Sequence, residues 1–283
     1  MNDLKRILLM VCCMLVICSG AFAKQKTVLD YDPDFFNILP WYADEETNGE
    51  NEEKGRMEEG SEVKKEEKTG EKTVEKAVNS IDLVVILDKS GSMYSMVDDT
   101  IGGFNSYLDE QRKKDIPVKV SMGMFNQKLE EKYSRVDLKD VKNLTNEDYV
   151  PQGMTALFDA VGNTLSALKT DEGVNAEGNK VLVVIITDGM ENASSEWTKS
   201  TVKGLIGELR GKGYEFVFLG ADIDAADVAE DIGISRETSM KFKKTGAGVK
   251  GNFKAMSVMM DTVSEGSSLV RDIKWKSAIV EDK

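Results

Sequence analysis

The chain has 283 residues, a formal net charge of −13 and no histidine. This length allows one large domain or two small ones, and an acidic protein repels the phosphates of nucleic acids and anionic lipids. Without histidine, catalysis by a Ser-His or Cys-His pair is excluded, and the usual ligand of zinc and copper is missing.

Residues 1–23 have the pattern of a secretory signal peptide. A short basic start precedes an apolar stretch over 7–17, which is too short to span a bilayer comfortably, and small residues in an Ala-x-Ala arrangement end at Ala23. We expect cleavage after Ala23 and export to the periplasm or the medium, with no membrane span in the mature chain. An uncleaved anchor is one alternative. Lipidation at Cys18 is another, although a bacterial lipobox places a small residue where Ile17 stands.

All three cysteines lie within this signal, at Cys12, Cys13 and Cys18. The mature chain would have none, so an exported protein would fold without disulfides. Its stability must then come from a hydrophobic core.

Two segments of different character follow the signal. Residues 24–43 carry five aromatic residues among acids and two prolines, which is compatible with a short docking segment and equally with a disordered tail. Residues 44–79 consist almost entirely of Glu, Lys, Gly, Asn, Thr and Ser. Such a composition buries too little apolar surface to offset the entropy of ordering. We predict a disordered, charged linker over 44–79.

From residue 80 to about 270, strand-like and helix-like patterns alternate, which predicts a folded domain over 80–270 and leaves 271–283 as a C-terminal tail. Continuous apolar runs, typical of strands buried on both faces, occupy 81–87, 181–186 and 216–219. An alternating run and a probable hairpin partner occupy 118–124 and 129–136. Apolar residues at helical spacing predict helices over about 101–108, 157–168, 202–209, 225–232 and 249–263. We expect a doubly wound, mostly parallel α/β sheet with one antiparallel edge strand.

Oxygen-bearing side chains stand where the predicted strands end. The first apolar run is followed by Asp88, Ser90 and Ser92, the run over 181–186 by Asp188, and Thr155 precedes a helix, where it would otherwise be an ordinary N-cap. Ligands of open parallel sheets bind beyond the carboxyl ends of the strands, and Mg²⁺ takes oxygen ligands. The sequence therefore predicts a Mg²⁺ site, which Mn²⁺ or Ca²⁺ could also occupy.

The order Asp-x-Ser-x-Ser, loop Thr and Asp-Gly on these elements resembles the metal-ion-dependent adhesion site (MIDAS) of von Willebrand factor type A (VWA) domains. The flanking sequences, which resemble bacterial secreted members of the family, are those at 101–105, 151–160, 187–192 and 218–222. The resemblance covers about 80–270. It implies that the hydroxyls bind the metal directly, that the aspartates often act through water, and that a Glu or Asp of a partner protein fills the remaining position.

The resemblance thus implies an exported, metal-dependent protein-binding module and not an enzyme. A structural VWA domain, in which the metal only stiffens the loops, uses the same residues and stays open as an alternative. A phosphatase of the haloacid dehalogenase type is the enzyme alternative, but it needs a second aspartate where Ser90 stands. Glu191 and Asn192 either orient ligands or stabilise their loop. Asp222 lies either at the rim of the site or in a helix-capping turn.

Overall fold

The computed structural model describes residues 77–278. The predicted signal peptide, the aromatic segment over 24–43 and most of the predicted linker lie outside the described residues. Among the described residues, no helix is long and apolar enough to cross a membrane.

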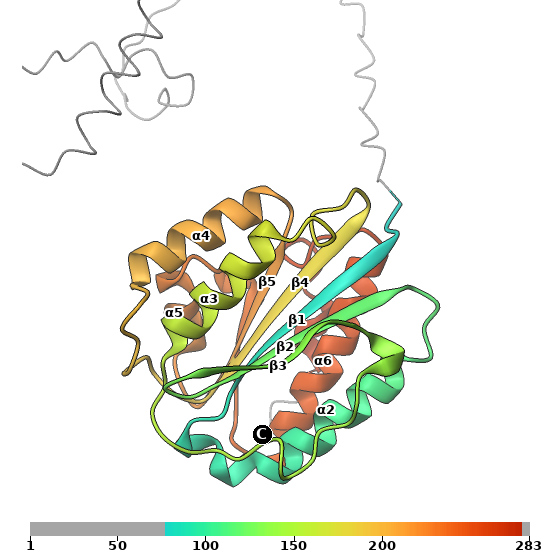
Figure 1. Cartoon of the computed structure of the whole chain (residues 1–283). Helices are drawn as coiled ribbons and strands as arrows, with labels where there is room; N and C mark the ends of the chain where they lie inside the picture. Colours follow the sequence, from blue (N-terminus) through green and yellow to red (C-terminus); the bar gives the residue numbers. More distant parts are fainter. Residues whose placement is uncertain (1–76, 279–283) are drawn as a thin grey trace, which may run out of the picture. The chain divides into compact units, whose positions relative to one another are not determined.

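A twisted sheet of six strands, in the order β3-β2-β1-β4-β5-β6, forms the centre of the described part (Figure 1). The strands are β1 (Ser80–Asp88), β2 (Val118–Phe125), β3 (Leu129–Asp137), β4 (Asn179–Thr187), β5 (Glu215–Ala221) and β6 (Ser239–Phe242). Every neighbouring pair is parallel except β2 and β3. The predicted mostly parallel sheet with one antiparallel edge strand is confirmed.

Helices cover both faces of this sheet. They are α2 (Val97–Gln111), α3 (Leu157–Thr170), α4 (Lys199–Gly211), α5 (Ala225–Asp231) and α6 (Gly246–Ser264). The helices α2 and α6 lie on one face, and α3, α4 and α5 lie on the other (Figure 1). The predicted helices are therefore confirmed, and each observed end lies within four residues of the predicted one.

The central strand β1 contributes side chains to both hydrophobic layers. Leu83, Val85 and Leu87 pack toward α2 and α6, whereas Val84 and Ile86 pack toward α3 and α4, and all five are at most 1% exposed. A strand covered on both faces must be apolar at every position. This explains why the strand is a continuous apolar run instead of an alternating one.

Two elements at the carboxyl-terminal end of the domain were not predicted. The edge strand β6 has only four residues, of which the first and the last are buried, and so short a run has no detectable period. The short helix η5 (Lys274–Ala278) places Trp275 fully inside the core layer of α2 and α6. The predicted tail at 271–283 therefore needs correction, because the core continues to Ala278.

The path of the chain creates a crevice at the carboxyl ends of the strands. After β1 the chain goes to β2 on one side, and β4 later joins β1 on the other side. The loops that follow β1 and β4 therefore diverge, and ligands of such sheets bind in the crevice at that point. Ser80, where β1 begins, lies at the opposite end of the strand, about 26 Å from Asp88 at ~3.3 Å per residue.

Candidate metal centre

Four of the five predicted site residues form a chain of contacts at the carboxyl ends of β1 and β4. Asp88 Oδ1 accepts a hydrogen bond from the backbone N–H of Ser90 at 2.6 Å. The hydroxyl oxygens of Ser90 and Ser92 lie 3.1 Å apart, and Ser92 Oγ donates to Asp188 Oδ1 at 2.6 Å. Two strands and one loop thus bring two carboxylates and two hydroxyls together.

Thr155 is held beside this chain by its neighbours. Asn192 accepts a hydrogen bond from the Thr155 N–H through Oδ1 at 2.9 Å and donates its own N–H to the Thr155 carbonyl at 3.0 Å. A Cβ at Gly189 would lie 2.8 Å from Thr155 Oγ1 and 3.6 Å from Asp88 Oδ2. Gly189 is therefore the close-packed point between the Thr155 hydroxyl and the Asp88 carboxylate. Ala156 occupies the N-cap position of α3 and makes no side-chain cap bond, so the N-cap interpretation of Thr155 is wrong.

Backbone hydrogen bonds join the loop after β1 to the loop before α3. The Gln152 N–H donates to the Lys89 carbonyl at 2.9 Å, and the Gly91 N–H donates to the Gly153 carbonyl at 3.1 Å. Gly153 has φ +77°, and a Cβ there would lie 1.9 Å from Gln127 Oε1. Its positive φ favours glycine, and a Cβ there would displace the Gln127 amide oxygen that accepts from the Met154 N–H. This turn directly precedes Thr155.

The site is buried at its base and open at one side. Asp88, Ser90, Thr155 and Asp188 are at most 4% exposed, whereas Ser92 is exposed. Burial raises the pKa of Asp88, and the negative charge of Asp188 adds to the rise, while hydrogen bonds from Thr187 and Ser90 oppose it. The site thus holds two mutually repelling carboxylates in a place where an added cation would be favoured.

Three further residues that the sequence did not single out contact the site. Thr187 donates its hydroxyl to Asp88 Oδ2 at 2.6 Å, and Tyr149 donates its hydroxyl to the Asp88 carbonyl at 2.6 Å. Lys244 places its ammonium 2.9 Å from Asp188 Oδ2. Thr187 could have been inferred from its position beside Asp188, but Tyr149 and Lys244 reach the site through loops with no motif.

Glu191 supports its own loop and the start of α3. Its carboxylate accepts hydrogen bonds from the N–H groups of Phe158, Ala193 and Ser194, which is the loop-stabilising role. Asn192 holds Thr155, which is the orienting role. The capping residue of α5 is Asp224, which accepts from the Asp227 N–H at 3.3 Å, whereas Asp222 donates its N–H to the Phe242 carbonyl at 2.9 Å and so joins β5 to β6.

The residues present fit a hard divalent cation. All five candidate ligands offer oxygen, which Mg²⁺ requires. The buried Asp188 Oδ2 accepts no hydrogen bond of adequate geometry, although the Lys244 ammonium lies within ion-pair distance. No group of three or more His, Cys, Asp or Glu gathers within residues 77–278, as expected for a site with two carboxylates and three hydroxyls.

No family model matches the sequence, and no curated protein matches it. Solved structures do match. The pilus adhesin SpaC from Lactobacillus rhamnosus GG, in its open conformation, has a TM-score of 0.51 and 15% identity over 65% of this chain and 30% of that chain. A von Willebrand factor type A structure from Catenulispora acidiphila has a TM-score of 0.45 and 12% identity, over 64% and 42%. Proximal thread matrix protein 1 from the mussel byssus, with a zinc-occupied MIDAS motif, has a TM-score of 0.46 and 16% identity, over 66% and 46%.

This chain spans less than half of each of these three proteins. Identities this low concern the fold alone, and of the three scores only that of SpaC exceeds 0.5. The strand order, the single antiparallel edge and the helices on both faces of this chain define its fold class. The described domain therefore has a doubly wound, mostly parallel α/β fold with one antiparallel edge strand.

Proposed function

We propose that this chain is an exported protein-binding module whose metal ion captures a carboxylate of a partner protein. The ion would be Mg²⁺, or Mn²⁺ or Ca²⁺ on the same oxygens, and five side chains would hold it: Asp88, Ser90, Ser92, Thr155 and Asp188. The observation that carries the proposal is the continuous contact from Asp88 through the two serines to Asp188.

The hydrogen bonds leave the hydroxyl oxygens available to a cation. Ser92 Oγ gives its proton to Asp188, so its lone pairs stay available to a cation. Asp88 keeps both oxygens in place through Thr187 and the Ser90 N–H. A bound Mg²⁺ supplies an open coordination position for an oxygen ligand, and mostly neutral hydroxyl ligands leave that position attractive to a further anion.

Exposed apolar side chains around the site favour a protein as the partner. Among the described residues, the large hydrophobic side chains that are most exposed are Tyr94, Val150, Met154, Met190, Val270 and Ile273. Tyr94 stands two residues from Ser92, Met154 one residue from Thr155 and Met190 two residues from Asp188, on three different segments of the chain. Exposed apolar groups that surround a polar site are typical of interaction surfaces. We name these three residues the apolar rim.

The apolar rim specifies the partner further. Tyr94, Met154 and Met190 are 76%, 56% and 68% exposed, and burying such side chains against a partner yields about 1.5–3 kcal/mol each. A small anion would leave them in water. The chemistry of the surface therefore fits a protein segment whose Asp or Glu is flanked by apolar side chains.

The direction of the chain leaves this surface accessible. The described chain enters β1 at Ser80, at the end of the strand opposite Asp88. The linker predicted over 44–79 would therefore join the domain at the end away from the metal centre. This arrangement suits a binding module held off a surface by a spacer.

The enzyme alternative receives less support from the geometry. The Asp88 carboxylate is 0% exposed, and both of its oxygens accept hydrogen bonds, from Ser90 and Thr187. A phosphatase nucleophile needs a free oxygen aimed at its substrate. The structural alternative, a metal that only stiffens the loops, predicts Mg²⁺-dependent stability without Mg²⁺-dependent binding.

The test uses the full chain and two synthetic peptides, one with a glutamate between leucines and one with glutamine in its place. We expect the glutamate peptide to bind to the wild type in the presence of Mg²⁺ and to be released by EDTA. We expect no binding of this peptide to Asp188→Ala. The control Asp231→Ala changes an exposed carboxylate paired with Lys199 on α4 and α5 and is expected to bind like wild type. Equal binding of both peptides, or glutamate binding that persists in EDTA, would show that no metal bridge forms.

Two further outcomes separate the alternatives. Thermal stabilisation by Mg²⁺ without any peptide binding, together with failure to retain a protein from the native envelope or medium in Mg²⁺, would favour the structural VWA domain. Release of phosphate from an aryl phosphate that Asp88→Asn abolishes would favour the phosphatase.

A further inference from the structure

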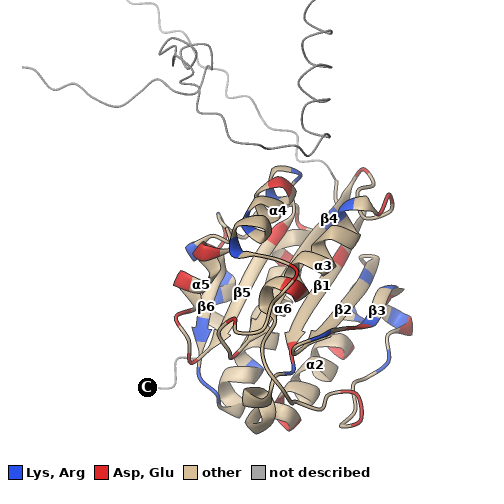
Figure 2. Cartoon of the chain, turned by 60° about the vertical axis from the view of Figure 1, so that its left-hand side comes forward, with Lys and Arg blue, Asp and Glu red and all other residues tan. Residues whose placement is uncertain are grey.

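Lys244 brings a positive charge into the candidate metal centre. It lies in the loop between β6 and α6, where Lys and Arg appear in blue at the end of β6 in Figure 2. Its ammonium is 2.9 Å from Asp188 Oδ2, and its side chain is 29% exposed while that of Asp188 is fully buried. The centre therefore contains an internal cation on one of its two carboxylates.

The contacted oxygen is the one that the rest of the site leaves unused. Asp188 Oδ1 accepts the Ser92 hydroxyl, whereas no hydrogen bond of adequate geometry reaches the buried Oδ2. The ion pair with Lys244 therefore engages this oxygen. A metal cation that binds to Asp188 would therefore share this carboxylate with the Lys244 ammonium.

The backbone around Lys244 is fixed, so only its side chain is free to respond. β6 is paired with β5, and the Asp222 N–H donates to the Phe242 carbonyl at 2.9 Å. Thr245, the next residue, is the N-cap of α6 and accepts from the Gly248 N–H at 3.1 Å. Lys244 is therefore presented to Asp188 by an ordered loop and does not arrive there as part of a mobile tail.

Electrostatics predicts two consequences of this placement. Without a metal, the ammonium offsets the repulsion between the buried carboxylates Asp88 and Asp188, which favours the folded, empty site. With a metal, the ammonium and the divalent cation repel each other at short range, where the effective dielectric constant is far below that of water. The same residue thus stabilises the empty site and weakens metal binding.

We propose that Lys244 is a built-in competing cation, which shares Asp188 with the metal and sets the affinity of the site for divalent ions. This inference rests on the proposed metal site. It assigns a specificity-determining role to a loop residue outside the five ligands: the charge at position 244 decides how much Mg²⁺ the site needs before it can capture a carboxylate.

The test measures Mg²⁺ and Mn²⁺ binding to the full chain by calorimetry and thermal unfolding in EDTA. Lys244→Gln is expected to bind either ion about tenfold tighter, since one repulsive unit charge is removed at short range, and to unfold at a lower temperature in EDTA. Lys244→Arg keeps the charge and is expected to resemble wild type. Lys241→Gln, on β6 and exposed, removes an equal charge away from Asp188 and is the matched control.

The outcomes distinguish this inference from the proposed function. Wild-type or weaker metal affinity in Lys244→Gln, with normal affinity in Lys241→Gln, would overturn the competition and make Lys244 an orienting partner of Asp188. Equal tightening in both variants would mean a general charge effect and would also overturn it. Failure of the wild type and of Lys244→Gln alike to bind either ion would overturn the metal site itself.

Discussion

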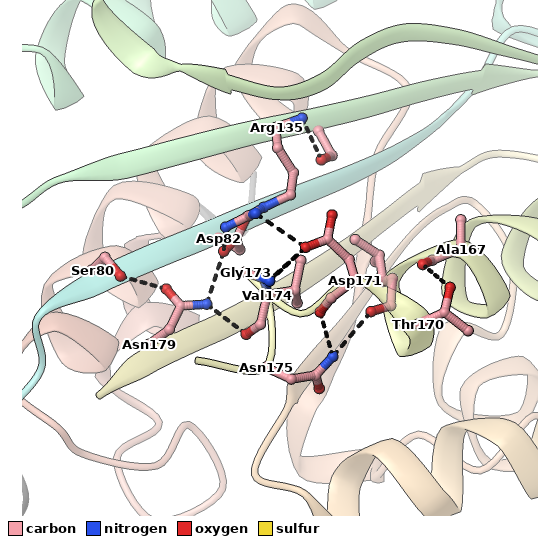
Figure 3. Close-up of polar contacts among 12 residues, drawn as sticks. Ser80, Asp82, Arg135, Ala167, Thr170, Asp171, Gly173, Val174, Asn175 and Asn179 are labelled. Atoms are coloured by element: carbon pink, nitrogen blue, oxygen red, sulfur yellow. Dashed lines mark hydrogen bonds and ion pairs between the residues drawn. The ribbon is translucent and has the colours of Figure 1, made fainter. Parts of the chain in front are cut away.

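The strand β1 carries a buried aspartate near each end, and the two are compensated in different ways. At the amino end, Asp82 accepts hydrogen bonds from Arg135 Nε at 2.8 Å, from Arg135 Nη2 at 3.1 Å and from Asn179 Nδ2 at 2.8 Å (Figure 3). At the carboxyl end, Asp88 receives only a hydroxyl and a backbone N–H, and a second carboxylate lies close by.

The difference separates an aspartate that ties strands together from one that the proposed metal site would use. Arg135 meets the Asp82 carboxylate with two nitrogens and Asp171 with its third, at 3.1 Å (Figure 3). Both oxygens of Asp82 therefore already accept hydrogen bonds from a cation. Arg135 comes from the edge strand β3, next to a register shift, with φ 48°. It therefore ties β3 to β1, whereas at the carboxyl end Lys244 pairs with Asp188, and Asp88 is held by a hydroxyl and a backbone N–H instead of a cation.

The largest expected effect is that of Arg135→Met on stability. Removing the guanidinium leaves Asp82 buried without its cation, which typically costs about 3–5 kcal/mol of the free energy of unfolding. Urea denaturation would measure the loss, and Mg²⁺ affinity should be unchanged because the site lies at the other end of β1. Lys199→Met, which breaks an exposed ion pair with Asp231, is the control. A loss as small as in this control would remove the distinction between the two ends.

Mg²⁺ should stabilise the protein through the carboxyl end alone. At a hundred times its dissociation constant, a ligand that binds only the folded state adds about 2.7 kcal/mol to the free energy of unfolding. We expect this increment in wild type and in Arg135→Met, but not in Asp188→Ala, when urea curves in Mg²⁺ and EDTA are compared. An increment in Asp188→Ala equal to that of wild type would place the ion elsewhere.

Thr187→Val removes the hydroxyl that holds Asp88 Oδ2. Leaving this buried carboxylate oxygen without its donor should cost about 1–3 kcal/mol of stability, and loss of a group that orients a ligand typically lowers metal affinity about 10–100-fold. Calorimetric titration of Mg²⁺ would measure the second effect. Thr262→Val, which alters a buried threonine hydroxyl on α6, should leave Mg²⁺ affinity at the wild-type value. Wild-type affinity in Thr187→Val would show that Asp88 needs no orientation by this hydroxyl.

The smallest expected change in stability belongs to the apolar rim. Met190→Ser alters a side chain that is 68% exposed, so the free energy of unfolding should change by no more than about 0.5 kcal/mol. Binding of the glutamate peptide should nevertheless weaken about tenfold, because less apolar surface is buried on contact. Ile273→Ser, at a residue 50% exposed outside the rim, is the control. Equal peptide affinity in both variants would show that the apolar rim does not contribute to binding of the peptide.

Most of the fold could be predicted because its signals are local. A strand covered on both faces is apolar at every position, and an amphipathic helix repeats its apolar residues with a period of 3.6, so β1, β4, α3 and α4 are visible in the sequence. β6 is too short to show a period, and Trp275 lies in a five-residue 3-10 helix with no repeat. These two elements depend on what they pack against.

The candidate site also has a part that was predictable from the sequence and a part that was not. Asp88, Ser90, Ser92 and Asp188 follow strands directly, and parallel strands end at one edge of a sheet, so the sequence by itself determined that these oxygens would gather. Only the tertiary structure decided which groups compensate them. Asp82 and Arg135 are 53 residues apart, and Asp88 and Thr187 are 99 apart, while Lys244 reaches Asp188 from the loop after the unpredicted strand β6. Strand register and loop path set such contacts, and no short-range pattern encodes either of them.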